Sequence, residues 1–220
     1  MMRTLLQQTL VAAATLIFTA SAYAGIGTAS ANDAHLAGDA ADAFAYKDSW
    51  NPQQGPNGNT SGFLSAFSSY GSGPWSLLSK MDNGDKSDTW GYLKFTFDDT
   101  WGPGGVWTVK NLSMDKAITI DLVMAIHAGN QGGAWLFDNQ LILPGQTLNG
   151  DWLIGWTVGN NNLVTGNGRN HGPNNPDFSN MTIFGRDKII TQVPEPETYG
   201  MLLAGLAALG AFARRRARAV

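Results

Sequence analysis

The feature that most constrains the fold is an alternation of apolar with other residues in the middle of the chain. Isoleucine, leucine or methionine occupies every second position from Ile118 to Ile126. Successive side chains of a β-strand point to opposite faces of a sheet, so this pattern predicts a strand with one continuous apolar face. Because such a face must be covered, we expect 118–126 to be the central strand of a sheet.

Shorter stretches on both sides repeat the same period. Apolar residues alternate over 93–97, and a Gly/Pro-rich turn separates them from 106–110, which predicts a hairpin. Further strands are expected at 134–143, 152–158 and 181–184, each bounded by Gly, Asn or Pro. Short strands between such turns, without a clear amphipathic helix, indicate a mainly β body that is an antiparallel sandwich or jelly roll.

The region before these strands has a different composition. Residues 32–60 are rich in Ala, Asp, Asn, Gly and Pro, so little regular structure is expected there. Within this region, 40–46 is compatible with one helical turn or a short edge strand. The following segment, 62–70, has weak helical spacing.

The N-terminus has the pattern of a secretory signal peptide. Arg3 lies in a short basic region, and an apolar core covers residues 10–18. Ala22-Tyr23-Ala24 follows as a small-x-small cleavage site. We therefore expect an exported chain whose mature form begins after Ala24.

The last segment joins a proline-glutamate motif, an apolar run and an arginine cluster. The motif is Val193-Pro194-Glu195-Pro196-Glu197, and its glutamates are the only two of the chain. Proline disfavours helix at the residue before it, so the motif is expected to be extended and open to an enzyme. The run 199–213 predicts a short transmembrane helix, about 22 Å long against a bilayer core of about 30 Å. Positive flanks stay cytoplasmic, which is the expected role of a basic tail formed by Arg214, Arg215, Arg216 and Arg218.

This arrangement resembles the PEP-CTERM sorting signal of Gram-negative bacteria, which a membrane protease of the exosortase type reads. The resemblance implies an exported protein that is anchored transiently in the inner membrane through its C-terminal helix. After processing, such a protein is delivered to the cell envelope or the extracellular matrix. An ordinary tail anchor is the alternative interpretation.

The body is similar to extracellular domains found in many PEP-CTERM proteins. The segments that carry this similarity are 126–130, 134–138, Trp152 and 177–185. The chain departs from that pattern at His127, where Lys is usual, and at Asn180, where His is usual. Because these domains have no agreed activity, the resemblance assigns no catalytic residue.

Setting the two ends aside changes the charge balance. The chain divides into a signal peptide at 1–24, a β-rich extracellular body at 25–192 and the sorting signal at 193–218. The body then has nine Lys and Arg against fifteen Asp, and the chain has no cysteine. This acidic balance argues against nucleic acid or an anionic membrane surface as a partner. Without disulfides, the body must be held by its core or by oxygen-bound ions.

A search for catalytic residues finds little. The three histidines, His35, His127 and His171, show no metal-ligand spacing, and no Gly-x-Ser-x-Gly motif occurs. Asp98 and Asp99 are adjacent in a predicted turn, where their side chains would diverge. We therefore expect no enzymatic activity, and a polysaccharide-active enzyme is the third-ranked function.

The sequence also contains two candidate binding sites. Asp82, Asp85 and Asp88 offer carboxylates for calcium, although a polar turn explains them equally well. Trp156, beside the polar loop 159–176, is the candidate for stacking on a sugar ring. The expected function is a structural or adhesive role with exopolysaccharide in a biofilm, and a carbohydrate-binding module is the alternative.

Overall fold

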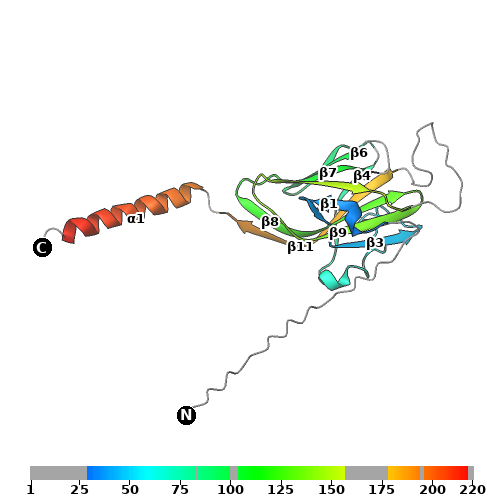
Figure 1. Ribbon diagram of the computed structural model, residues 1–220, viewed down its shortest axis with the longest axis horizontal. Coiled ribbons are helices and arrows are strands. Elements are labelled where there is room, and N and C mark those ends of the chain that lie inside the picture. Colours follow the sequence, from blue (N-terminus) through cyan, green and yellow to red (C-terminus); the bar gives the residue numbers. More distant parts are fainter. Residues whose placement is uncertain (1–28, 83, 100–103, 157–177, 194–195, 218–220) are drawn as a thin grey trace, which may run out of the picture.

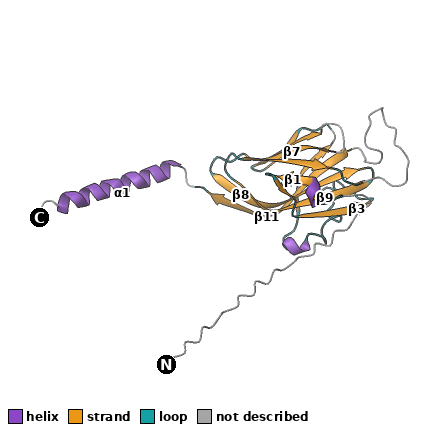
Figure 2. Cartoon of the chain, viewed as in Figure 1, coloured by secondary structure: helices purple, strands orange, loops and turns teal. Residues whose placement is uncertain are grey.

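The body of the protein is a sandwich of two antiparallel sheets. The computed structural model describes residues 29–82, 84–99, 104–156, 178–193 and 196–217 (Figure 1). Six strands form one sheet in the order β2 (Asp39–Ala40), β1 (Ala34–Leu36), β10 (Thr147–Leu153), β7 (Gly104–Asn111), β6 (Leu93–Asp99) and β5 (Ser87–Trp90). Five strands form the other in the order β3 (Ala43–Asp48), β9 (Gln131–Ile142), β8 (Lys116–Ala128), β11 (Phe178–Gln192) and β4 (Ser76–Asp82). The prediction of a mainly β, antiparallel body is confirmed (Figure 2).

Several predicted strands are present, with different limits. The alternating stretch lies in β8, which is the central strand of the five-stranded sheet, and β6 pairs with β7 as the expected hairpin. The strand expected at 152–158 instead spans Thr147–Leu153, because its pairing with β7 begins at Thr147 and ends at Leu153. The strand expected at 181–184 is the much longer β11, which pairs with both β8 and β4.

The region expected to be irregular is more ordered than its composition indicated. It contains β1, β2 and β3, and of these β3 is the edge strand that 40–46 allowed. Short 3-10 helices occupy Ala31–Asp33 and Ser68–Tyr70. Cross-strand pairing joins β1 to β10 and β3 to β9, and the buried side chains of Ala34, Leu36 and Ala45 pack these strands onto the two cores.

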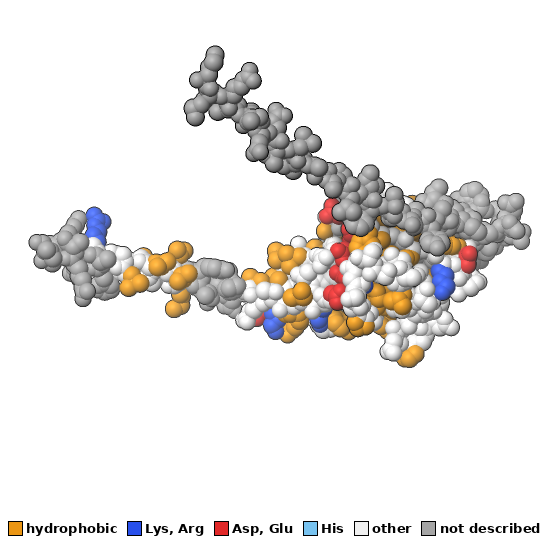
Figure 3. Space-filling model, turned by 90° about the horizontal axis from the view of Figure 1, so that it is seen from below, with side chains coloured by type: hydrophobic (Ala, Val, Ile, Leu, Met, Phe, Trp, Pro, Cys, Tyr) orange, Lys and Arg blue, Asp and Glu red, His pale blue; other side chains and the backbone are white. Residues whose placement is uncertain are grey.

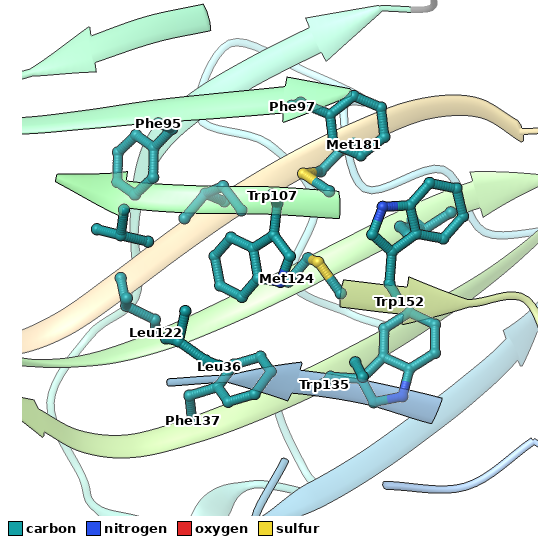
Figure 4. Close-up of a cluster of buried hydrophobic side chains, with 14 of the residues drawn as sticks. Leu36, Phe95, Phe97, Trp107, Leu122, Met124, Trp135, Phe137, Trp152 and Met181 are labelled. Atoms are coloured by element: carbon teal, nitrogen blue, oxygen red, sulfur yellow. The ribbon is translucent and has the colours of Figure 1, made fainter. Parts of the chain in front are cut away.

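The main core fills the space between the two sheets. Figure 4 shows Trp107 and Trp152 from the six-stranded sheet beside Met124 and Phe137 from the other. The rings of Trp107 and Phe137 lie 5.4 Å apart, and Phe97 stacks on Trp152 at 5.4 Å. Ile118, Ile120, Leu122, Met124 and Ile126 all belong to this core, which explains their alternation.

A second core covers the opposite face of the five-stranded sheet. Small or medium side chains on this outer face leave room for three aromatic residues of the segment 49–75, namely Trp50, Phe63 and Phe67. The members of this outer core are Ala45, Trp50, Phe63, Phe67, Val123, Ala125, Ala134, Leu136 and Phe184. β8 is therefore buried on both faces, whereas its alternation predicted only one apolar face.

A buried ion pair anchors the far end of the 49–75 segment. The Nε of Arg186 lies 2.9 Å from Oδ2 of Asp121, and both side chains are almost fully buried. Arg186 Nη1 also donates to the carbonyl of Gly71, at 2.8 Å, and its guanidinium lies 4.3 Å from the ring centre of Trp75. Pairing a buried charge in this way avoids the cost of an isolated one and fixes the segment on the sheet.

The tail forms one helix, α1 (Pro196–Ala217). In the part of the chain that the structure describes, no helix is long and apolar enough to cross a membrane. The helix predicted at 199–213 is thus confirmed, and the finding does not support it as a span. The apolar run ends before Arg214, so a window of spanning length takes in charged flanking residues.

Candidate functional site

The sorting motif lies at the junction of the body and the tail. The backbone N–H of Val193 donates to the carbonyl of Asp115 at 2.7 Å, so the strand remains tied to the body up to this residue. Pro196 opens α1, where its missing N–H costs no hydrogen bond, and Glu197 follows in the first turn. Pro194 and Glu195 lie outside the described residues.

The other predicted features of the two ends can be placed only in part. Arg214, Arg215 and Arg216 lie in the last turns of α1, and Arg214 is exposed. Arg218 lies outside the described residues. The signal peptide, with its cleavage residues Ala22 and Ala24, lies outside them as well.

The proposed calcium ligands are not assembled into a site. An Asp85 carboxylate oxygen accepts from the N–H of Asp82 at 2.9 Å, and Asp88 accepts from the N–H of Thr89 at 2.7 Å. The Asp85 carboxylate therefore stabilises the turn after β4, and the Asp88 carboxylate stabilises the backbone of β5 itself. The described residues contain no group of three or more His, Cys, Asp or Glu side chains suited to hold a metal ion.

Trp156 is a core residue and not an exposed platform. It is fully buried, with its ring centre 5.8 Å from that of Trp135 and 6.0 Å from that of Tyr46. The chain after β10 turns into the sandwich, so this indole fills the end of the main core. The assignment of Trp156 as a sugar contact is wrong, and the loop 159–176 lies outside the described residues.

A polar pocket of about 420 Å³ lies at the end of the five-stranded sheet, where β8 turns into β9. Sequence analysis did not find it. Its lining comes from two segments far apart in the chain: Ser49, Asn51, Gln53, Gln54, His127 and Asn130. No local motif marks these residues, and the only signal was the departure of His127 from the pattern of similar domains.

The β8–β9 turn positions one wall of the pocket. Gly129 and Asn130 are its two central residues, with φ of 59° and 64°, which is the geometry of a tight hairpin turn. Asn tolerates this left-handed conformation better than other residues with a side chain. Ser49 also has a positive φ, and its N–H donates to the carbonyl of Asn130 at 2.9 Å. The two lining segments are thus joined by their backbones.

The opposite wall is held by amide and ammonium groups. Gln53 Nε2 donates to the carbonyls of Met81 and Met181, at 3.2 and 3.4 Å. Lys80 Nζ donates to the carbonyls of Gln53 and Gly55, at 2.8 and 2.6 Å. The loop is therefore fixed to β4 and β11, so the pocket does not depend on a ligand for its shape.

His127 gives the pocket an uncharged imidazole. Burial lowers the pKa of this ring, so it is neutral at pH 7. Its Nδ1 is buried and has no hydrogen-bond partner among the described residues. With Nδ1 buried, the ring can offer a ligand only its other nitrogen, whereas the Asn and Gln side chains each have a donor and an acceptor. This lining suits a neutral ligand with many hydroxyls better than an ion.

Exposed tryptophan platforms are scarce among the described residues. Trp50, Trp107, Trp135, Trp152 and Trp156 are buried. Of the other described tryptophans, Trp75 lies under Arg186, and Trp90 has the Lys188 ammonium 4.1 Å from its ring centre.

Comparison with known proteins identifies the tail alone. The family model described as the PEP-CTERM protein-sorting motif matches residues 192–217. No curated protein and no solved structure matches the chain. The chain is therefore a PEP-CTERM domain-containing protein, which is exported and processed at the membrane by an enzyme of the exosortase type.

Proposed function

We propose that this protein is a non-catalytic component of the cell envelope or extracellular matrix, with a structural or adhesive role among the exopolysaccharides of a biofilm. The sorting motif supports export and processing as the route to that location. A rigid, two-core β body supports a structural role.

The observation that carries the adhesive part of this proposal is the polar pocket. Its lining combines a serine hydroxyl, four amide side chains and a neutral imidazole, so donors and acceptors converge without formal charge. Sugar hydroxyls both donate and accept, and this lining matches them. The pocket is open and lacks an aromatic floor among its lining residues, which fits weak, repeated contact with a polymer better than tight capture of one small molecule.

A carbohydrate-binding module that stacks sugars on tryptophan is the second candidate. The buried or cation-covered state of the described tryptophans makes it less favoured than hydrogen bonding in the pocket.

The experiment that tests the proposal compares two equivalent substitutions. Asn130→Gly removes a pocket amide at a position where glycine adopts the positive φ without strain. Asn139→Gly makes the same change at another positive-φ asparagine, outside the pocket. Retention is measured on immobilised exopolysaccharide from the producing cells, with dextran as a neutral-glucan reference.

We expect Asn130→Gly to weaken retention about fivefold, the loss of roughly 1 kcal/mol from one hydrogen-bonding side chain. Asn139→Gly should bind like the unaltered protein. Equal retention of all three proteins would remove the pocket from the proposal. Intact-mass analysis of the secreted protein checks processing separately, because the tail after the motif should be lost.

A further inference from the structure

The end of the body from which the tail leaves is unusually apolar. Ten large hydrophobic side chains of the described body are exposed, and seven of them lie at this end. We call these seven the tail-end surface: Tyr92, Leu112, Met114, Leu141, Leu143, Ile189 and Ile190. Met114, at 85%, is the most exposed of the ten. Patches of this kind on a soluble body usually mark an interaction site.

Strand pairing and one backbone hydrogen bond place two pairs of the members side by side. Thr119 pairs with Leu141 on one side and with Ile189 on the other, so the three side chains share one face of the sheet. The N–H of Leu112 donates to the carbonyl of Tyr92 at 2.7 Å, which joins β7 to the start of β6. Figure 3 shows hydrophobic and basic side chains together at this end of the body.

Basic residues gather at the same end. Lys94, Lys110, Lys116 and Lys188 lie there, against the carboxylates Asp115 and Asp187, which leaves two net positive charges. Among the other described residues of the body, four are basic and twelve are acidic, a net charge of −8. The Lys116 ammonium lies 4.8 Å from the ring centre of Tyr92 and accordingly stands beside the apolar side chains. The charge of the body is thus strongly polarised toward this end.

The attachment of the tail determines what this end of the body lies close to. β11 ends at Gln192 and α1 begins at Pro196, so four peptide steps of about 3.5 Å separate them by about 14 Å at most. Because the sorting motif is read at the membrane, the end of β11 lies within that distance of the tail segment being processed, and Ile190 and Ile189 precede that end by two and three residues.

We propose that the tail-end surface docks the body on an anionic bilayer surface while the sorting motif is processed. Apolar side chains enter the headgroup region and lysines attract anionic lipids, a combination that neither group achieves alone. This inference rests on the membrane-processing step of the proposed function. It is independent of the sugar pocket at the other end of β8.

The cysteine-free sequence allows a direct test on the exported chain with its tail intact. Met114→Cys places an environment-sensitive fluorophore on the tail-end surface, and Val106→Cys places it at an exposed apolar position outside that surface. Vesicles of phosphatidylglycerol and phosphatidylethanolamine serve as the probe. We expect a blue shift and quenching by lipid-borne quenchers at position 114 only, weakened by salt.

A second variant separates docking from simple tethering by the tail. Leu141→Asp with Ile189→Asp, made in the Met114→Cys protein, keeps the tail but places charges on both sides of Thr119. If the tail-end surface docks on the bilayer, this variant should lose the fluorescence shift at position 114. Its intact tail should still make the chain sediment with the vesicles. An unchanged shift, equal shifts at 106 and 114, or no shift at 114 in a vesicle-bound chain would each overturn the proposal.

Two further outcomes would assign the surface to another partner and overturn the proposal. A shift that grows with protein concentration in the absence of lipid would indicate a second copy of the chain. A shift that needs the detergent-solubilised processing enzyme, and not lipid, would indicate a protein partner. Failure of the exopolysaccharide retention assay concerns the pocket and leaves this measurement unaffected.

Discussion

The two ends of β8 carry opposite kinds of surface. At His127 the strand borders a polar, uncharged pocket fixed by turns and backbone hydrogen bonds. At Lys116, about 36 Å away at 3.3 Å per residue, it borders exposed apolar side chains and lysines. A single strand therefore separates the surface suited to a hydrophilic polymer from the surface suited to a membrane. Because the two surfaces lie at opposite ends of the body, a polymer bound at one end would not block a membrane at the other.

The prediction with the largest expected effect is a substitution that unfolds the body and so removes both surfaces at once. Ile120 lies in the main core between the two ends, and Ile120→Asp forces an unpaired charge between the sheets. We expect a loss of about 4 kcal/mol in the free energy of unfolding, enough to prevent folding at 37 °C. Thr119→Asp, on the neighbouring outward position, is the control and should fold, as judged by circular dichroism and urea denaturation. Folding of Ile120→Asp would contradict the assignment of the core.

A smaller change should affect the pocket end alone. A Cβ added at Gly132 would lie 2.3 Å from the indole of Trp50 and 2.9 Å from its carbonyl, so Gly132→Ala overpacks the outer core beside the pocket. We expect a destabilisation of about 1–3 kcal/mol together with weaker exopolysaccharide retention. The fluorophore shift at position 114 should remain. Loss of that shift would show that the two ends are coupled.

The smallest expected effect is on the pH dependence of stability. It comes from Asp138, which lies between the two ends of the body. Burial raises the pKa of Asp138, and the neighbouring carboxylates of Asp121 and Asp42 add to this shift. The folded state therefore binds a proton more readily than the unfolded chain, whose Asp pKa is about 3.9. This contribution to stability is complete below the unfolded pKa and is lost as the pH rises through the folded value.

Asp138→Asn should remove that dependence, because the amide cannot ionise. We expect urea midpoints measured between pH 4 and 7 to fall less with rising pH in the variant than in the unaltered protein. A parallel pair of profiles would show that Asp138 titrates normally. Both surfaces should keep their ligands in this variant, since neither includes Asp138.

The sequence predicted the features that depend on neighbours in the chain. The period of two identified β8 and the β6–β7 hairpin, because each inward residue of those strands enters the main core. The sorting motif was recognisable because a processing enzyme reads a short contiguous segment. Of the early strands, only β3 was allowed for, as one of two options at 40–46. β1 and β2 escaped prediction because they are too short to show a period, and pairing with β10 and with each other is decided by the fold.

The functional sites of the body, in contrast, depend on contacts between distant segments, and the sequence did not predict them. Trp156 was placed at the surface because its flanking loop is polar, yet the fold turns its ring into the core. The net negative charge predicted no attraction to an anionic membrane, but a total cannot reveal that four of the seven lysines gather at one end. The pocket joins residues 49–54 to 127–130, and no periodic or local signal connects those segments.

By itself, then, the sequence determined that the chain is exported, carries a sorting tail and folds as antiparallel β structure, because export signals and strand alternation are local patterns. Only the tertiary structure decided that β8 is buried on both faces, that the tryptophans fill cores, and that a polar pocket and an apolar, basic surface lie at opposite ends of one strand. Those properties depend on which distant segments meet, and that is set by the packing of the whole chain.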